Sequence, residues 1–407
     1  MSRRTVLVLG DYRQTITIVR SLGRAGFKVV LGCERPNSST TLSRHVSALR
    51  VLDPSSAERY RDSLAGCLNR ERFDFVFPVG ETELRRLVCG GLHALASLSR
   101  WIMPETATVL RCFDKRAMYH LAAALGIPVA AWRPYAGGSA ALRDAEEIGY
   151  PVVVKRKDSS AMLCGTNAII CRSSAELERF LDLTYRDPDP ASLIIQKYAA
   201  GQRHNCHFAA ERGKMVAFFQ QKVLRTDKRD GTGIGIEGVS VAPSSALRAY
   251  CGQLLQRLDY SGIGCIQFLV DEESRSVAFL ELNARMDSTA VLPYRLGVDF
   301  PLIAVKIAAG EPIHAPEGYA EGKRYYYLYG ALNVWLAQRR SESLRRVLAW
   351  PVTVPWIALR SYDLMLDWRD PLPALHQLAK RVTETRPSRR VQRPTPSDRS
   401  IEPSVRP

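Results

Sequence analysis

The sequence has 407 residues, too many for one compact hydrophobic core, and its length predicts two or three domains. Its 46% apolar and 24% charged residues are typical of a globular protein, and no segment has the roughly 18 apolar residues that a membrane-spanning helix needs. The formal net charge of +16 is partly concentrated in the Arg- and Pro-rich segment 386–407, which we expect to be a disordered basic tail, so no specific nucleic acid is expected as a partner.

The first 110 residues alternate strands and helices. Apolar runs predict three buried strands, at 6–9, 28–32 and 73–78. Residues 14–25 between the first two have helical periodicity, and this βαβ order predicts a parallel sheet covered by helices. The loop 80–83 follows a strand end, where such sheets bind ligands. Only Gly10 stands in the first strand–helix turn, so NAD binding is not expected.

The N-terminus and the cysteines bear on location. The apolar run after Arg3 and Arg4 ends at Gly10, after about five residues, and is too short for a signal peptide. Nine cysteines occur singly, with no C-x-x-C pair and no histidines at zinc spacing. We therefore expect a cytoplasmic protein whose cysteines are small core residues, without a thiolate metal site.

From residue 111 the pattern becomes α+β. Asp114 is the predicted N-cap of a helix over 115–125. Further strands are predicted at 149–155, 193–198, 215–224, 264–270 and 276–283, followed by a helix at 297–310. Residues 313–385 then form a small C-terminal extension with an apolar, Trp-containing stretch at 347–359. The segment 233–238 spells G-x-G-x-x-G, but it neither follows a clear strand nor opens a helix, and we expect a mobile loop there.

An acid, an amide and a guanidinium follow one another at every second position near residue 283. On a strand, alternate side chains point the same way, so Glu281, Asn283 and Arg285 would share one face. Two oxygen ligands and a fixed cation suit Mg²⁺ and the phosphates that it carries. An ordinary half-solvated edge strand has the same alternation and stays an alternative.

In this order, the segments resemble the ATP-grasp superfamily over roughly residues 5–312. The motifs that carry the resemblance are Asp114-Lys115 with Gly126-Ile127-Pro128, Tyr150-Pro151 through Lys155, Gln196-Lys197-Tyr198 with Gly201, Gln267, and Glu281-x-Asn283-x-Arg285. The resemblance implies an α/β pre-ATP-grasp domain with a parallel sheet (1–110), then a two-lobed α+β ATP-grasp fold (111–312). Its lobes would span about 111–195 and 196–312, before the extension (313–385) and the tail (386–407).

The resemblance also assigns candidate residues for ATP. Lys115 and Lys155 would contact the α- and β-phosphates, although a solvated lysine at a helix start or strand end is the plainer interpretation of each. Residues for the phosphate-covering loop, the adenine hinge and the ribose would be Ser159, Ser160, Gly165, Gln196, Lys197, Tyr198 and His204. The loop has a single glycine where many relatives have several, which puts its fit to the phosphates in doubt.

For metal and chemistry, the resemblance implies that Gln267, Glu281 and Asn283 hold two Mg²⁺ ions, with Mn²⁺ able to substitute. Gln267 stands where many relatives have an acid, although the carbamoyl-phosphate synthetase type also uses Gln there. An amide supplies a neutral oxygen, so one ion should bind more weakly. Arg285, Lys222 and Arg225 would stabilise the transferring phosphate, and a merely solvated basic strand competes for the last two.

The function that the resemblance implies is an ATP- and Mg²⁺-dependent ligase that activates a small-molecule carboxylate as an acyl phosphate and joins it to an amine. Two alternatives stay open: a catalytically decayed ATP-binding module, or a protein that docks on a membrane, a polyanion or a partner enzyme through residues 347–407. The sequence leaves the oligomeric state open, although homodimers are common among relatives.

Overall fold

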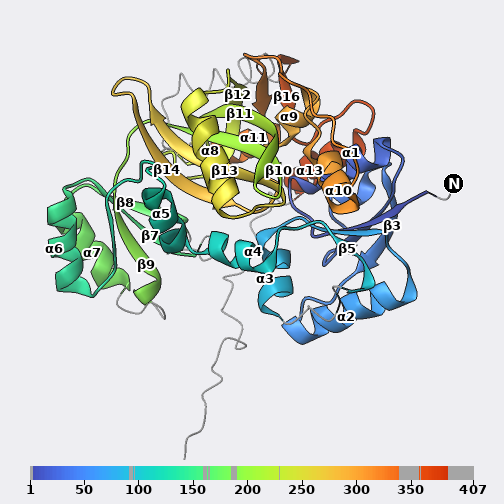
Figure 1. Cartoon of the computed structure of the whole chain (residues 1–407), viewed down its shortest axis with the longest axis horizontal. Coiled ribbons are helices and arrows are strands. Elements are labelled where there is room, and N and C mark those ends of the chain that lie inside the picture. Colours follow the sequence, from blue (N-terminus) through green and yellow to red (C-terminus); the bar gives the residue numbers. More distant parts are fainter. Residues whose placement is uncertain are drawn as a thin grey trace, which may run out of the picture.

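The computed structural model describes residues 3–90, 95, 97–158, 163, 166–184, 190–228, 230–338, 357 and 359–383. Three sheets organise this part of the chain (Figure 1): a five-stranded parallel sheet near the N-terminus, a small four-stranded sheet at the opposite end, and a seven-stranded sheet between them. The predicted tail 386–407, and most of the stretch 347–359 expected to dock on a membrane or partner, lie outside the described residues.

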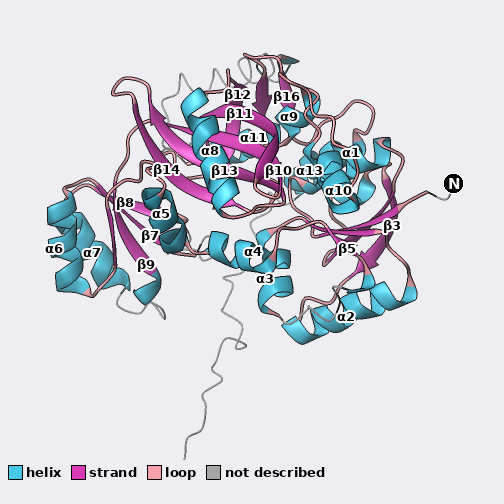
Figure 2. Cartoon of the chain, viewed as in Figure 1, coloured by secondary structure: helices cyan, strands magenta, loops and turns pink. Residues whose placement is uncertain are grey.

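The first sheet has the strand order β3-β2-β1-β4-β5. Its strands are β1 (Thr5–Leu9), β2 (Lys28–Cys33), β3 (Val46–Val51), β4 (Phe75–Pro78) and β5 (Arg100–Trp101), and all pair in parallel. Helices α1 (Thr15–Arg24), α2 (Ala57–Arg70) and α3 (Glu81–Cys89) flank it (Figure 2). Along β1, Val6 and Val8 belong to one core cluster while Leu7 and Leu9 belong to another. Both faces of the strand are therefore covered, which explains its continuous apolar sequence.

Two helices lead from this domain into the small lobe. After α4 (Thr106–Phe113), helix α5 (Lys115–Ala124) begins at Asp114, whose carboxylate accepts from the backbone N–H of Arg116 at 2.8 Å and confirms the predicted N-cap. The lobe's antiparallel sheet, in the order β6-β9-β7-β8, consists of β6 (Trp132–Pro134), β7 (Val152–Arg156), β8 (Ala168–Cys171) and β9 (Leu193–Lys197). Helices α6 (Gly138–Ile148) and α7 (Ser174–Thr184) pack on it.

The central sheet has the order β14-β13-β10-β11-β12-β15-β16. Its strands are β10 (Gln202–Glu211), β11 (Lys214–Thr226), β12 (Gly235–Ser240), β13 (Gly262–Asp271), β14 (Ser276–Asn283), β15 (Arg324–Tyr326) and β16 (Ser361–Asp363). Helices α8 (Ser245–Arg257), α9 (Val291–Arg295) and α10 (Phe300–Ala309) follow the strands in the chain. Because β15 pairs with β12, the predicted boundary at residue 312 does not coincide with a break in the sheet.

The segment 233–238 was expected to be a mobile loop, but from Gly235 onward it belongs to the strand β12. Its glycines make room for an aromatic side chain: a Cβ on Gly238 would lie 2.4 Å from Cε1 of Tyr325, and one on Gly235 would lie 2.6 Å from the Tyr325 hydroxyl. Tyr325, on β15, is fully buried. The expectation of a loop was wrong here because the glycines serve close packing between strands rather than flexibility.

The C-terminal part returns to the first domain. After α11 (Leu328–Gln338) and β16, helix α13 (Leu372–Thr383) packs beside the first sheet. Just before α13, Asp370 forms a buried ion pair with Arg20 of α1 at 2.9 Å, and both side chains are 2% exposed. The C-terminal part is thus fastened to the first domain rather than extending from it.

Two expectations from composition can be compared with this fold. Cys33, Cys112, Cys171 and Cys265 are buried, as predicted for small core residues. No helix among the described residues is long and apolar enough to cross a membrane.

Candidate functional site

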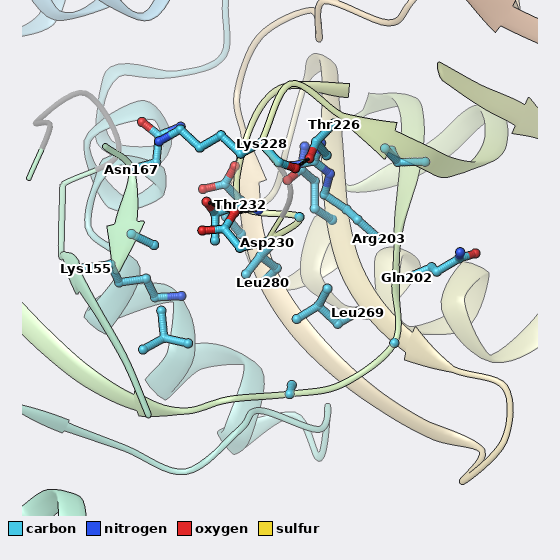
Figure 3. A pocket seen from close by; sticks show the side chains of 18 of the residues that line it. Lys155, Asn167, Gln202, Arg203, Thr226, Lys228, Asp230, Thr232, Leu269 and Leu280 are labelled. Atoms are coloured by element: carbon cyan, nitrogen blue, oxygen red, sulfur yellow. Dashed lines mark hydrogen bonds between the residues drawn. The ribbon is translucent and has the colours of Figure 1, made fainter. Parts of the chain in front are cut away.

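A cavity of about 1000 Å³ opens between the small lobe and the central sheet; we call it the interlobe cavity. Strands β7, β8 and β9 line it from the small lobe, β11, β13 and β14 from the central sheet, and α11 from the C-terminal part. In Figure 3, Lys155 points from β7 into the cavity, opposite Asp230 and Thr232. Most of the predicted site residues that the structure describes lie on its walls.

The three predicted metal ligands come together on β13 and β14. Gln267 and Glu281 are direct cross-strand partners, and Asn283 follows two residues further along the same strand. The Asn283 amide donates to Glu281 Oε1 at 2.9 Å, and all three side chains line the cavity. One carboxylate and two amide oxygens form a donor set that suits a hard cation such as Mg²⁺ and carries only one negative charge.

Two lysines face this donor set. Lys115 Nζ lies 3.5 Å from Glu281 Oε2, and Lys155 is only 6% exposed. Burial, together with the positive charge of Lys115, lowers the pKa of Lys155 to about 7, against the opposing effect of Glu281. Burial alone would raise the pKa of Glu281, but Lys115, the hydrogen bond from Asn283, and Arg285 outweigh it and lower that pKa. The cluster is therefore suited to hold a polyanion, which would stabilise the charged form of Lys155.

Arg285 connects the interlobe cavity to the first domain. Its guanidinium lines the cavity and lies 3.9 Å from Glu81 Oε2, at the start of α3. Glu81 also pairs with Arg85 at 2.8 Å, and Arg85 in turn pairs at 2.5 Å with Asp158, which lines the cavity just after β7 of the small lobe. A chain of ion pairs thus joins the first domain to both walls of the cavity.

The predicted adenine hinge lines the cavity, but several of its polar groups already have partners. Gln196 donates to the backbone oxygen of Ala130 at 3.2 Å, and Lys197 Nζ donates to the Gly149 and Tyr150 carbonyls at 2.9 and 3.2 Å. Tyr198 is 38% exposed at the rim. The Gln196 and Lys197 side chains thus hold the hinge in shape.

Two predicted residues do not line the cavity. His204 and Lys222 face each other across β10 and β11, where Lys222 pairs with Glu272 at 2.6 Å and His204 Nδ1 lies 2.9 Å from Gln220 Nε2. Burial and the charge of Lys222 lower the pKa of His204 to about 4. Their neighbour Arg225 does line the cavity and donates to the Tyr326 hydroxyl at 2.9 Å. Ser159, Ser160 and Gly165 lie outside the described residues.

The cavity also contains residues that sequence reasoning did not single out. They are Asn167, just before β8, the residues Lys228, Asp230 and Thr232 after β11, and Val334 and Trp335 of α11. Lys228 extends toward Asn167 (Figure 3). Trp335 lies in the C-terminal segment, more than 50 residues after the Glu281 motif, and no local pattern connects the two.

Known proteins are similar to this chain in sequence. Residues 114–315 match the family model described as "Carbamoyl-phosphate synthase L chain, ATP binding domain". The chain is 26% identical over 336 residues to the carbamoyl phosphate synthase large chain, N-terminal section, of Methanopyrus kandleri, covering 77% of this chain and 56% of that protein. The chain therefore spans about half the length of this curated relative.

Solved structures are similar in fold at low sequence identity. Biotin carboxylase from Campylobacter jejuni has a TM-score of 0.64 at 17% identity, with 79% of this chain and 74% of that chain covered. N5-carboxyaminoimidazole ribonucleotide synthetase from Thermus thermophilus has a TM-score of 0.60 at 16% identity, with 78% and 81% covered. The overall fold is thus shared with these enzymes.

Proposed function

Because the chain belongs to the ATP-grasp superfamily, we propose that it is an ATP- and Mg²⁺-dependent ligase that activates a carboxylate as an acyl phosphate and joins it to an amine. The observation that carries this proposal is the convergence of Gln267, Glu281 and Asn283 with Lys115 and Lys155 on one cavity. A volume of about 1000 Å³ is at the upper end of the range for small-molecule sites and leaves room for a nucleotide and a second substrate.

Each step of the proposed reaction needs positioning and charge. A carboxylate oxygen attacks the γ-phosphorus of ATP and ADP leaves; the amine nitrogen then attacks the acyl carbon, phosphate leaves, and the nitrogen loses a proton. Lys115 and Lys155 would hold the nucleotide phosphates, and Arg285 would neutralise charge on the transferred group. Magnesium bound by Gln267, Glu281 and Asn283 would neutralise the phosphate oxygens. No nucleophilic side chain is required.

The ion pairs of the site refine the roles that the resemblance implies. Arg225 lines the cavity and keeps its candidate role beside the transferred phosphate. Lys222 has no role in this scheme, since its ammonium pairs with Glu272 and does not line the cavity.

A screen for ADP release, crossing a panel of carboxylates with a panel of amines, tests the proposal directly. We expect one pair to stimulate release, and Glu281→Ala to abolish it while the fold is kept. Glu272→Ala is the matched control, because Glu272 is an exposed acid at the turn between β13 and β14. Undiminished ADP release by Glu281→Ala would contradict the assignment.

A second candidate is an ATP-binding module without turnover, and the single carboxylate among the three metal ligands favours it. It predicts that the chain binds ATP in calorimetry while no carboxylate–amine pair releases ADP. The same panel therefore separates the two functions.

A further inference from the structure

A second cavity, of about 620 Å³, lies at the carboxyl edge of the parallel sheet; we call it the carboxyl-edge crevice. The loops that follow β1 and β2 and the first turns of α3 line it, and Tyr329 of α11 and Gln377 of α13 line it from the C-terminal part. In the sheet, β2 and β3 lie on one side of β1, and the chain then crosses to β4 on the other side of β1, so the direction of strand addition reverses there. A reversal of this kind opens a crevice beyond the strand ends, where open α/β sheets bind ligands.

A buried carboxyl group forms part of this crevice. Glu83, in the first turn of α3, is 3% exposed, and its Oε2 has no hydrogen-bond partner among the described residues. Glycines in two neighbouring turns make room for the Glu83 side chain. A Cβ on Gly10 would lie 2.8 Å from Glu83 Cδ, and one on Gly80 would lie 2.6 Å from Oε2. Burial raises the pKa of Glu83, against the opposing effects of the Tyr12 hydroxyl and of Arg86. An oxygen buried in this way is costly unless something donates to it.

A cation that pairs with no acid among the described residues lies in the same crevice, which Asp11 and Glu34 also line. Arg13 lines it with its guanidinium 5.3 Å from the Tyr327 ring centroid, and no ion pair joins Arg13 to an acid within the described part of the chain. Arg86, by contrast, is neutralised by Glu34 at 2.5 Å. One carboxyl oxygen that lacks a donor and one guanidinium that lacks an acid therefore line one cavity.

The crevice adjoins the interlobe cavity. Glu81 pairs with Arg285 of the interlobe cavity, and Thr82 and Glu83, next in the chain, line the crevice. Helix α11 also lines both: Tyr329 near its start faces the crevice, and Trp335 near its end faces the interlobe cavity. A ligand in the crevice would thus lie beside the residues proposed to activate the carboxylate.

We infer that the carboxyl-edge crevice binds a small zwitterion of the amino-acid class, with its ammonium group against Glu83 and its anionic group against Arg13. An ammonium group supplies the donor that Glu83 Oε2 lacks, and a carboxylate supplies the acid that Arg13 lacks. That this amino acid is one of the two substrates rests on the proposed function; that it binds in the crevice does not.

Binding of the twenty proteinogenic L-amino acids to the whole protein without ATP tests the inference, by saturation-transfer NMR followed by calorimetry. We expect at least one to bind. Its hydroxy-acid analogue, which lacks the ammonium group, and its decarboxylated amine should each bind about tenfold more weakly or worse. Failure of every amino acid to bind would overturn the inference.

Two variants test which end of the ligand Glu83 and Arg13 each contact. Glu83→Gln should weaken the amino acid and the amine alike by about tenfold, whereas Arg13→Gln should weaken the amino acid and leave the amine unchanged. Glu58→Gln, at an exposed acid in the first turn of α2, is the matched control and should change nothing. Unchanged affinity in Glu83→Gln would overturn the inference.

A thermal melt at pH 7 separates a binding role from a structural one. Replacing a buried carboxyl with a neutral amide should leave the melting temperature unchanged or raise it. A clear fall, with binding per folded molecule intact, would instead make Glu83 a structural residue and overturn the inference. If the amino acid binds and no partner stimulates ADP release, the proposed ligase function fails while the binding site stands.

Discussion

The interlobe cavity and the carboxyl-edge crevice each contain one ionisable group that the fold leaves poorly neutralised, and the two groups have opposite sign. In the cavity, burial and Lys115 lower the pKa of Lys155 to about 7. In the crevice, burial raises the pKa of Glu83. Because a ligand of complementary charge would restore each group to its ordinary charged form, the direction of each shift indicates the ligand. The cavity should take a polyanion and the crevice a cationic group.

The largest expected effect is at Lys155, the group that marks the interlobe cavity as an anion site. Lys155→Met keeps the length of the side chain and removes its charge, and we expect ADP release to fall about a thousandfold because a phosphate contact is lost. Lys214→Met, at an exposed lysine of β11, is the matched control. Near-normal ADP release by Lys155→Met would contradict the interpretation of the interlobe cavity as an anion site.

Lys155→Met should lower ADP release but raise the stability of the folded protein near neutral pH. The folded-state pKa of Lys155, about 7, lies below its ordinary value of 10.5, so its charged form destabilises the fold fully below pH 7 and no longer above about pH 10.5. The wild type should therefore gain stability over this range, and Lys155→Met should lack that gain. Urea unfolding at several pH values measures both, and an identical pH dependence in the two proteins would contradict the shift.

The next effect concerns the C-terminal wall of the crevice, which the Arg20–Asp370 pair fastens to the first domain. Asp370 also accepts from Ser43 Oγ at 2.7 Å and from the Arg44 backbone N–H at 3.0 Å. Asp370→Ala leaves a buried guanidinium without a counter-charge and should cost about 3 kcal/mol of unfolding free energy. In urea titrations, Asp182→Ala, on the exposed face of α7, should cost almost nothing.

Asp370→Ala also distinguishes the two cavities. Met365 and Gln377, on either side of Asp370 in the chain, line the crevice and not the interlobe cavity. Amino-acid binding should weaken more than ATP binding. Burial alone would raise the pKa of Asp370, but its hydrogen bonds and Arg20 lower it. Its stabilising effect is therefore present above the ordinary value of 3.8 and is lost on acidification. Equal weakening of both ligands would show that the two sites are not separable.

A smaller effect, and a gain, is expected at Gln267. Gln267→Glu adds a second carboxylate opposite Glu281 and should lower the Mg²⁺ concentration for half-maximal ADP release about three- to tenfold. Gln202→Glu adds the same charge on the cavity wall, but on β10 opposite Val270 rather than opposite Glu281, so it controls for a general electrostatic effect. An unchanged or higher Mg²⁺ requirement in Gln267→Glu would mean that this position does not face the metal.

The sequence predicts those strands and site residues whose pattern is contained within one continuous segment. Alternation along β14 was enough to group Glu281, Asn283 and Arg285, and the apolar runs were enough for the parallel sheet. Strand β10 was missed because polar side chains that the fold buries, His204 and Asn205 among them, hide its apolar signal. Pairing of β12 with β15 joins segments more than 80 residues apart and leaves no local trace.

The same limit explains which residues of the candidate sites the sequence did not predict correctly. Lys222 was grouped with Arg225, but the register of β11 against β12 shifts between Val223 and Arg225, so simple counting along the strand fails there. In the crevice, residues 80–83 were expected as a loop near a ligand; residues 81–83 instead form the start of α3. Arg13 and Tyr329 come from segments that only the folded chain brings beside them. Local patterns thus identify one wall of a site but not the opposite one.

The smallest expected effect is at Glu81, the acid between the two cavities. Glu81 pairs with Arg85 at 2.8 Å and lies 3.9 Å from Arg285, and these side chains are 13% to 24% exposed. Partly exposed pairs of this kind contribute about 1 kcal/mol or less, so Glu81→Gln should hardly change the melting temperature. If the pairs couple the sites, ATP and the crevice ligand should strengthen each other's binding in the wild type, and this mutual effect should shrink about two- to fivefold in Glu81→Gln. Calorimetry of each ligand with and without the other measures the coupling, with Glu105→Gln, just before α4, as the control. Unchanged coupling in Glu81→Gln would mean that the cavities communicate through α11 instead.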